Sequence, residues 1–415
     1  MTAQIPRTIL ADLADPKIFD DCFAFSQKLG KGSDGEVSSY LHRSTGRVIA
    51  VKTSREYFWS SEAIHDEIDA QIFMSDYGKH LHQNIAHMLA CHREFGDTLS
   101  PAIFFEQAEF GDLITYRNAW LEQDYASDCP CNIPEAMVWK LFKDMMLALD
   151  YLHNHCSFIH RDVKSQNILV FLPPHADSSL IPTLPVFKLC DFSRAVAYAF
   201  PEGQVRGWAG TQDYAPPFSE RRTNDPARPS GDMWSLGATL QEFALGILPV
   251  QSREALIAQM DQRFELHPKL VGDEARWKQP EWDIKFSAMY RPLNASVKTL
   301  MNWWDVSRPL SRSYKPFSDE LNTWYRRLFD TNWQLRATAA ILVKHLLPII
   351  DVYIGTEPWL PKNRRTDSVL ATQYGAPPPV GARGAEIKKA HVRARYYAAM
   401  QDYKASYEGN AYPLS

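Results

Sequence analysis

The chain has 415 residues, of which 45% are hydrophobic, 12% aromatic and 23% charged. At roughly 150 residues per domain, this length predicts two lobes with extensions, and the composition excludes a disordered, collagen-like or coiled-coil chain. The 45 basic and 49 acidic residues give a net charge of −4. No overall basic field therefore favours nucleic acid or a membrane as the main partner.

The sequence also lacks the patterns of membrane and secreted proteins. No apolar run approaches the ~18–20 residues of a membrane span, and the start of the chain has no apolar stretch like that of a signal peptide. The six cysteines are sparse and irregularly spaced, which is typical of reduced proteins. Cys129 and Cys131 have no second pair to complete a metal site. We therefore expect an intracellular protein, cytoplasmic or nuclear.

The first part of the chain has the pattern of short β-strands. From Phe23 to Ala50, β-branched and aromatic runs are interrupted by a glycine-rich loop and a Ser-Thr-Gly turn. A helix is predicted from Ser61 to Met74, where Ile64 and Ile68 lie near one face.

The rest of the chain has mainly helical patterns. From about Pro134 onward, apolar residues recur every four positions. These residues are Met137, Leu141, Met145 and Leu149. Two short strands, Ile168–Phe171 and Val186–Leu189, enclose a proline-rich insertion, and after residue 350 we expect a surface tail with a candidate helix at 385–403. A small β-rich half followed by a larger α-helical half predicts an α+β fold.

The glycine-rich loop has the spacing G-x-G-x-x-G-x-V, formed by Gly30, Gly32, Gly35 and Val37. Glycines allow a backbone to approach phosphate oxygens and donate N–H groups to them. The dinucleotide-binding fold uses a similar spacing but requires a helix directly afterwards. Because a strand follows here, the pattern favours a phosphate-binding hairpin over that fold.

Lys52 ends a strongly apolar strand. A buried ammonium group costs several kcal/mol unless it is paired, so a carboxylate and a phosphate are its natural partners. Glu67 on the following helix is the first candidate, and Glu62, one to two turns earlier, is the second. A lysine that only extends its charge to solvent at a strand end remains the structural alternative.

A polar loop at residues 160–167 lies between two apolar stretches. Polar groups that enter and leave a core in this way must bind one another or a ligand. The loop contains Asp162, Lys164 and Asn167, and Asp191 follows the next strand. Asn167 and Asp191 offer oxygen ligands of the kind that Mg²⁺ prefers.

Together these motifs resemble the eukaryotic protein kinase family over about residues 23–350. The resemblance implies a bilobal protein-kinase-like fold and ATP and Mg²⁺ as cofactors. It implies that the loop of Gly30, Gly32 and Gly35 covers the ATP phosphates, and that Lys52 binds the phosphates and pairs with Glu67. Asp162 would accept the proton of the substrate hydroxyl, and Asn167 and Asp191 would bind the metal.

The same resemblance implies a site for adenine and a division of the chain. Phe105 matches the gatekeeper, and adenine would bind the Glu106 carbonyl and the Ala108 N–H. Further expected nucleotide contacts come from the first strands, at Leu29, Val37 and Ala50. The expected division is an N-terminal extension (1–22), an N-lobe (23–107), a C-lobe (108–350) and a C-terminal tail (351–415).

Lys164, two residues after Asp162, and Thr211 resemble the serine/threonine branch of the family. A lysine at this position neutralises charge on the transferred phosphoryl group. The expected function is transfer of the γ-phosphoryl group of ATP to Ser/Thr hydroxyls of protein substrates. The alternatives are a dual-specificity enzyme, a small-molecule kinase and a pseudokinase scaffold that binds proteins without catalysis; the oligomeric state stays open.

Two departures from the family pattern generate predictions. Ser193 replaces the glycine of the D-F-G motif, and Phe218 replaces the glutamate of the A-P-E motif. Arg336 matches the arginine that normally pairs with that glutamate, and a guanidinium that stays charged cannot be buried unpaired without a large cost. We therefore predict that Glu220 pairs with Arg336, with backbone carbonyls or another acid as the alternative.

The activation segment, from Asp191 to residue 218, contains few sites for phosphorylation. Between Phe192 and Thr211 the only hydroxyl side chains are Ser193 and Tyr198. Arg161 can pair with an activation-segment phosphate in related kinases, so it needs another partner here, and Glu202 is the acid in this interval.

Two regions keep alternative interpretations. Residues 251–327, which contain several tryptophans, are either a docking surface or local core of the C-lobe. The basic and aromatic residues of 385–403 either bind nucleic acid or an acidic partner, or form a helix packed on the kinase domain. Nucleic acid is the less favoured of these.

Overall fold

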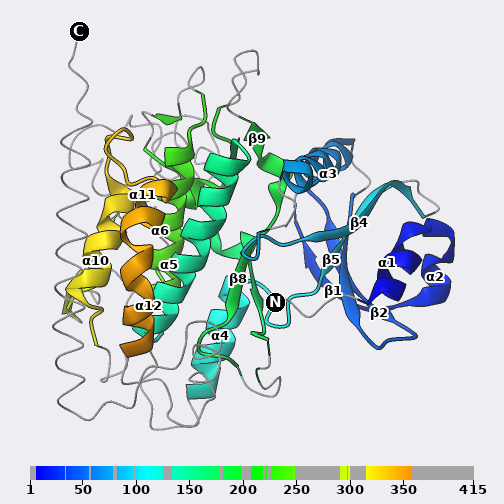
Figure 1. The fold of residues 1–415 in the computed structure, drawn as a ribbon, viewed down its shortest axis with the longest axis horizontal. Coiled ribbons are helices and arrows are strands. Elements are labelled where there is room, and N and C mark those ends of the chain that lie inside the picture. The colour runs from blue at the N-terminus through cyan, green and yellow to red at the C-terminus, as the bar shows by residue number, and fades with distance from the viewer. Residues whose placement is uncertain are drawn as a thin grey trace, which may run out of the picture.

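The computed structural model describes most of the chain as two lobes joined near residue 107 (Figure 1). The described residues are 6–32, 34–55, 58–77, 82–96, 100–124, 133–174, 176, 181–197, 207–217, 220–221, 226–247, 290–296, 298–299 and 315–356. A β-sheet lobe comes first and a larger helical lobe follows. This order confirms the predicted α+β, bilobal architecture.

The N-lobe is built on a five-stranded antiparallel sheet with the strand order β1-β2-β3-β5-β4. Its strands are β1 (Phe23–Lys31), β2 (Glu36–His42), β3 (Val48–Thr53), β4 (Met88–Phe95) and β5 (Ser100–Glu106). One face of the sheet packs on helix α3 (Phe58–Tyr77), where Ile64 and Ile68 contact Ile103. The helix predicted for 61–74 is thus confirmed and is longer at both ends.

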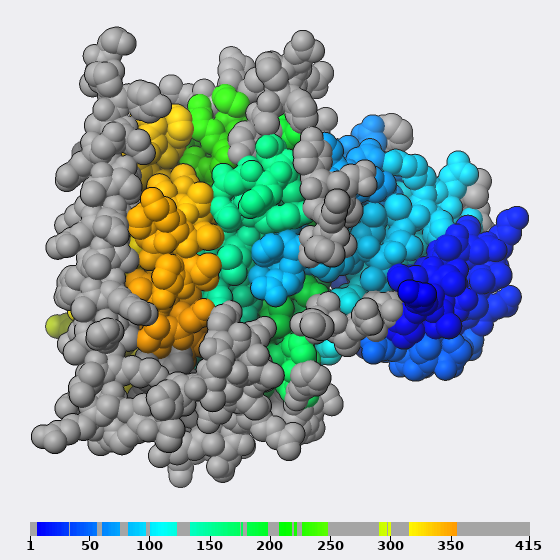
Figure 2. Space-filling view, viewed as in Figure 1, coloured from blue at the N-terminus to red at the C-terminus, as the bar shows by residue number. Residues whose placement is uncertain are grey.

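The other face of the sheet is covered by the N-terminal residues, which the sequence analysis treated only as an extension. Helix α1 (Arg7–Ala14) buries Ile9 and Leu13 against the sheet, and helix α2 (Phe19–Cys22) buries Phe19 in the same cluster. The ring of His92 donates through Nε2 to the Leu13 carbonyl over 2.7 Å. These helices form the outer end of the lobe (Figure 2), so they belong to its hydrophobic core.

The C-lobe surrounds helix α5 (Glu135–Asp150), whose predicted core positions are all fully buried. Within the described residues, its other helices are α4 (Leu113–Asp124), α6 (Pro229–Leu245), α10 (Asp319–Arg326), α11 (Ala339–His345) and α12 (Leu347–Thr356). A π-helical turn, Tyr151–His155, continues α5. Helix α12 extends past residue 350, and its Ile354 is part of the C-lobe core.

Two pairs of short strands lie at the surface of the C-lobe that faces the N-lobe. Strands β7 (Ile168–Phe171) and β8 (Val186–Leu189) pair antiparallel and have the bounds predicted from the sequence. Strand β6 (Phe158–Ile159) pairs with β9 (Val196–Ala197). The polar loop predicted at 160–167 therefore begins at β6 and ends at β7.

Several predicted features lie outside the described residues, among them Cys129, Cys131, the candidate helix at 385–403 and most of 251–327. In the described part of 251–327, Leu321 and Trp324 are fully buried in the C-lobe core, which supports the core interpretation there. The four cysteines within the described ranges are free thiols. None of the described helices is both long and apolar enough to cross a membrane.

The predicted contact between Arg336 and Glu220 is confirmed. Arg336 donates from Nη1 and Nη2 to the two carboxylate oxygens of Glu220, over 3.0 and 2.5 Å. Arg336 is 1% exposed and Glu220 is 5% exposed. The guanidinium also donates to the carbonyls of Ser230 and Asp330 and lies over the ring of Trp234. The chain just after the activation segment is thereby fixed to the C-lobe by a glutamate two residues beyond the position that the family motif uses.

We expect Glu220→Ala to lower the free energy of unfolding by roughly 3–5 kcal/mol, because it leaves a buried charge without its counter-ion. Denaturant unfolding measures this loss, with Glu62→Ala as a control because Glu62 is an exposed acid. The double variant Glu220→Ala/Arg336→Met should recover part of the stability. Unfolding of Glu220→Ala at the wild-type midpoint would contradict the account of this pair.

Candidate active site

The polar loop after β6 is held in place by Asp232 of helix α6. The Asp232 carboxylate accepts hydrogen bonds from the backbone N–H groups of His160 and Arg161, each over 2.8 Å. Asp232 is 1% exposed and also contacts Nε2 of His153 over 2.8 Å. Arg161 has a φ of 70°, a conformation that is unfavourable for a residue with a β-carbon. The bonds to Asp232 compensate for this strain and fix the loop.

Asp162 is the centre of a hydrogen-bond network at the top of this loop. Its Oδ1 accepts from the backbone N–H and the hydroxyl of Thr211, over 2.7 and 2.8 Å. Its Oδ2 accepts from Lys164 Nζ over 2.7 Å, and Asn167 donates from Nδ2 to the Asp162 carbonyl over 2.9 Å. The fold therefore brings Thr211, which is distant in sequence, together with the three polar residues that the sequence analysis selected from this loop.

Lys52 joins the two lobes through a buried ion cluster. Its Nζ lies 2.6 Å from Glu67 Oε2 and 2.8 Å from Asp191 Oδ1. The side chain of Glu67 is 1% exposed, whereas Glu62 is exposed to solvent. The predicted pairing of Lys52 with Glu67 is therefore confirmed. Glu62 is not the partner of Lys52, and Lys52 does not extend its charge to solvent.

The charges in this cluster fix its protonation states. Burial by itself would lower the pKa of Lys52, but the charges of Glu67 and Asp191 outweigh it and raise that pKa above its ordinary value. Burial would likewise raise the pKa of Asp191, yet the Lys52 charge and the hydrogen bonds from Lys52 and Ser193 hold it well below its usual range. Asp191 is thus a carboxylate at neutral pH.

Gly30, Gly32 and Gly35 of the glycine-rich segment differ in whether the surrounding structure requires a glycine at that position. A β-carbon on Gly35 would lie 2.7 Å from the Thr53 carbonyl, so the sheet itself requires a glycine there. A β-carbon on Gly30 would have no neighbour within 4 Å, and one on Gly32 would have none closer than 4.0 Å. Packing in the described protein does not require these two glycines, which fits a backbone that a ligand approaches.

The expected adenine-contacting residues lie on and next to the N-lobe sheet. Val37 pairs with Lys52 across β2 and β3, and Ala50 pairs with Phe105 across β3 and β5. Cross-strand partners point to the same face of a sheet, so these four residues share the face that carries Lys52. Leu29 is 42% exposed at the irregular end of β1, and Glu106 and Ala108 are partly buried where the chain leaves β5.

The sequence analysis missed a contact between the end of β5, where the chain passes from the N-lobe to the C-lobe, and strand β8 of the C-lobe. Lys188 of β8 is fully buried and donates from Nζ to Glu106 Oε2 over 3.1 Å. The same ammonium group lies 4.3 Å from the centre of the Phe171 ring. A lysine in an otherwise apolar strand was the available signal, because such a charge needs a partner when it is buried.

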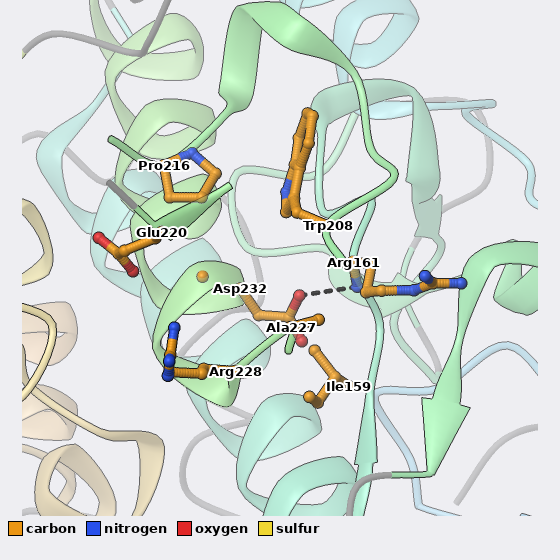
Figure 3. Close-up of a pocket in the computed structure, with 9 residues that line it drawn as sticks. Ile159, Arg161, Trp208, Pro216, Glu220, Ala227, Arg228 and Asp232 are labelled. Carbon is orange, nitrogen blue, oxygen red and sulfur yellow. Dashed lines mark hydrogen bonds between the residues drawn. The ribbon is translucent and has the colours of Figure 1, made fainter. Parts of the chain in front are cut away.

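The side chain of Arg161 binds backbone carbonyls of the activation segment. It donates from Nε to the Arg194 carbonyl over 2.5 Å and from Nη1 to the Gly207 carbonyl over 2.8 Å. Figure 3 shows the small pocket beside it, with Trp208 and Arg161 on one side and Pro216 and Glu220 on the other. A β-carbon on Gly210 would lie 2.2 Å from the Arg161 carbonyl, so the segment packs directly on the loop of Asp162. Glu202, the expected acid, lies outside the described residues.

The residues expected to hold a divalent cation fit that role chemically. Cys190 N–H donates to the Asn167 carbonyl over 2.9 Å, which places Asn167 and Asp191 next to each other at the ends of β7 and β8. Asn167 uses its amide N–H group on Asp162, so its side-chain oxygen is the atom left for a metal. The Asp191 side chain is 28% exposed and ionised. Two oxygen ligands beside a phosphate site are typical of magnesium binding.

Comparison with known proteins agrees with this geometry. A family model described as "Protein kinase domain" matches residues 23–347. Serine/threonine-protein kinase atg1 of Schizosaccharomyces pombe is 26% identical over 248 residues, which cover 55% of this chain and 29% of that protein. Serine/threonine-protein kinase TIO of Arabidopsis thaliana is 32% identical over 222 residues, covering 53% of this chain and 14% of that protein.

A relative named as a dual specificity kinase matches over a similar length. Dual specificity mitogen-activated protein kinase kinase mek-2 of Caenorhabditis elegans is 26% identical over 234 residues, which cover 56% of this chain and 52% of that protein. The match thus spans between 14% and about half of the length of these curated relatives. The family model covers most of the chain, and we conclude that the chain belongs to the protein kinase family.

Proposed function

We propose that this chain is a catalytically active protein kinase that transfers the γ-phosphoryl group of ATP to Ser and Thr hydroxyls of protein substrates, with Mg²⁺ as its metal. The observation that carries the proposal is the simultaneous presence of two assembled clusters. Lys52 is paired with both Glu67 and Asp191, and Asp162 is bound by both Lys164 and Thr211. Active protein kinases require the strand lysine paired with the helix glutamate and the metal-binding aspartate in place, together with a loop aspartate that accepts the proton of the substrate hydroxyl.

Each residue has a proposed role that follows from its chemistry. Gly30 and Gly32 would give the phosphates access to backbone N–H groups, and Lys52 would bind two of the phosphates through its fixed ammonium group. Asn167 and Asp191 would hold Mg²⁺, which neutralises phosphate charge when bound.

The proposed acceptor of the substrate proton is Asp162. Its carboxylate is positioned by Thr211 and Lys164, so it needs no reorganisation before a hydroxyl approaches. Lys164, whose Nζ is 2.7 Å from Asp162 Oδ2, would stabilise negative charge on the transferred group. Leu29, Val37, Ala50, Phe105, Glu106 and Ala108 are the proposed contacts of adenine.

The alternative function is a pseudokinase scaffold. Such proteins usually lack the strand lysine, the loop aspartate or the metal-binding aspartate, and this chain has Lys52, Asp162 and Asp191. A second alternative is a dual-specificity kinase that also transfers phosphate to tyrosine, since one relative is named a dual specificity kinase kinase. The contact of Thr211 with Asp162 and Lys164 supports the serine/threonine assignment.

Asp162→Asn and Asp191→Asn should have different effects on nucleotide binding. We expect Asp162→Asn to keep the ATP affinity within about threefold while it lowers turnover by about a hundredfold or more, because it removes a base that acts in the transition state. Asp191→Asn should weaken Mg²⁺-dependent ATP binding by about tenfold or more. Calorimetric titration with ATP, with and without Mg²⁺, measures both. Equal losses of affinity in the two variants would contradict the roles.

We further infer that activity does not depend on phosphoserine or phosphothreonine in the activation segment. Arg161 uses its guanidinium on the carbonyls of Arg194 and Gly207, which provides a partner for this side chain without a phosphate. Phosphatase treatment of the purified protein should therefore change peptide phosphorylation by less than about twofold. A large loss of activity that maps to Thr211 or Tyr198 would refute this inference.

A further inference from the structure

A side-chain contact between Asp34 and Ser193 joins the glycine-rich loop to the start of the activation segment. Asp34 lies in the loop between β1 and β2, and Ser193 stands where the family motif has glycine. Ser193 Oγ is 3.1 Å from Asp34 Oδ2 and 2.8 Å from Asp191 Oδ1. The next residue, Arg194, donates from Nη2 to Asp34 Oδ1 over 2.9 Å. A glycine at 193 and an apolar residue at 34 could not form these contacts.

Both sides of this contact are anchored to the rest of the protein. On the N-lobe side, the Ser60 hydroxyl donates to the Asp34 carbonyl over 2.8 Å, and Arg55 donates to the Gly32 carbonyl over 3.2 Å. On the C-lobe side, Arg161 donates to the Arg194 carbonyl over 2.5 Å. Because both backbones are fixed, the three side chains connect the loop to the start of the activation segment.

Ser193 is also compatible with this backbone. Among the described residues, the non-glycine residues with positive φ are Ser157, Arg161 and Asp191, so Ser193 adopts a conformation open to any residue. Its hydroxyl carries one proton and can donate to only one carboxylate at a time. Lys52 neutralises Asp191 and Arg194 neutralises Asp34, which allows two carboxylates to share one hydroxyl.

We propose that Asp34, Ser193 and Arg194 form a latch that holds the glycine-rich loop against the activation segment, and that this latch must open for nucleotide to enter or leave. The proposal rests on the proposed function for its nucleotide. The side chain of Asp34 is 12% exposed, and it bridges the two lobes next to Lys52 and Asp191. Because Ser193 contacts Asp191, which pairs with Lys52, a loop held there would close the end of the site where the phosphates are proposed to bind.

The first test measures the latch itself, in the full chain without nucleotide. Hydrogen–deuterium exchange of residues 30–36 should be about fivefold faster or more in Asp34→Ala, because this variant loses a charge-assisted hydrogen bond and an ion pair. The control is Glu36→Gln, which removes a nearby ion pair to Lys28 (2.5 Å) that joins β1 and β2 only. Exchange in Asp34→Ala equal to that of the control would overturn the latch.

Coupling between the partners is a stricter test. Arg194→Gln should speed exchange of the loop in the wild-type background and have no added effect in the Asp34→Ala background, since its partner is then gone. Ser193→Ala should behave in the same way. Full additivity of Arg194→Gln and Asp34→Ala would show that the two residues act separately, and it would also overturn the proposal.

A second measurement tests the consequence for nucleotide. A fluorescent ATP analogue, bound with Mg²⁺ and chased with excess ATP, should dissociate about fivefold faster or more from Asp34→Ala than from wild type or Glu36→Gln. Faster loop exchange with unchanged dissociation would refute control of nucleotide exchange by the latch. If the wild-type protein does not bind the analogue, the proposed function fails, while the exchange experiment still decides the latch.

Discussion

The buried ion cluster of Lys52, Glu67 and Asp191 is the interaction on which the rest of the active site depends. The three residues come from β3, from α3 and from the segment after β8. The charges of Lys52 and Glu67 are buried and that of Asp191 is partly buried, so each needs an oppositely charged partner. Glu67 also accepts a hydrogen bond from the Phe192 N–H over 3.2 Å, and the Phe192 side chain is fully buried. Helix α3 and the start of the activation segment are thus fixed relative to the sheet by one set of contacts.

The second constraint is backbone strain at the loop of Asp162 and at Asp191. Arg161 and Asp191 have φ values of 70° and 63°, which a residue with a β-carbon rarely adopts. The surrounding hydrogen bonds compensate for it: Asp232 holds the N–H of Arg161, and Lys52 holds the carboxylate of Asp191. Packing of Gly210 against the Arg161 carbonyl adds the activation segment to the same rigid unit. Strain of this kind is typical of functional sites, where it positions reactive groups in advance.

Much of this arrangement could be predicted from the sequence, because a charged residue in an apolar stretch already indicates which kind of partner it needs. An isolated lysine in an apolar strand predicted a carboxylate partner, and a buried arginine without its usual glutamate predicted the contact with Glu220. The packing of α1 was not predictable, since Ile9 and Leu13 are buried by strands far along the chain. In the sequence, Asp34 is an ordinary polar loop residue. Only the fold shows that Ser193 and Arg194 lie beside it. A buried lysine such as Lys188 signals that it needs a partner, but neither segment alone shows which residue of the other lobe that partner is.

The central claim is that the assembled clusters transfer phosphate. The most direct measurement incubates the purified full-length chain with Mg²⁺-ATP and a library of Ser-, Thr- and Tyr-containing peptides and identifies the products by mass spectrometry, with Asp162→Asn as the matched control. The account predicts phosphoserine and phosphothreonine products with wild-type protein and a reduction of about a hundredfold or more with Asp162→Asn. ATP binding without any phosphopeptide, or equal product from both proteins, would contradict it and leave a nucleotide-binding scaffold as the function.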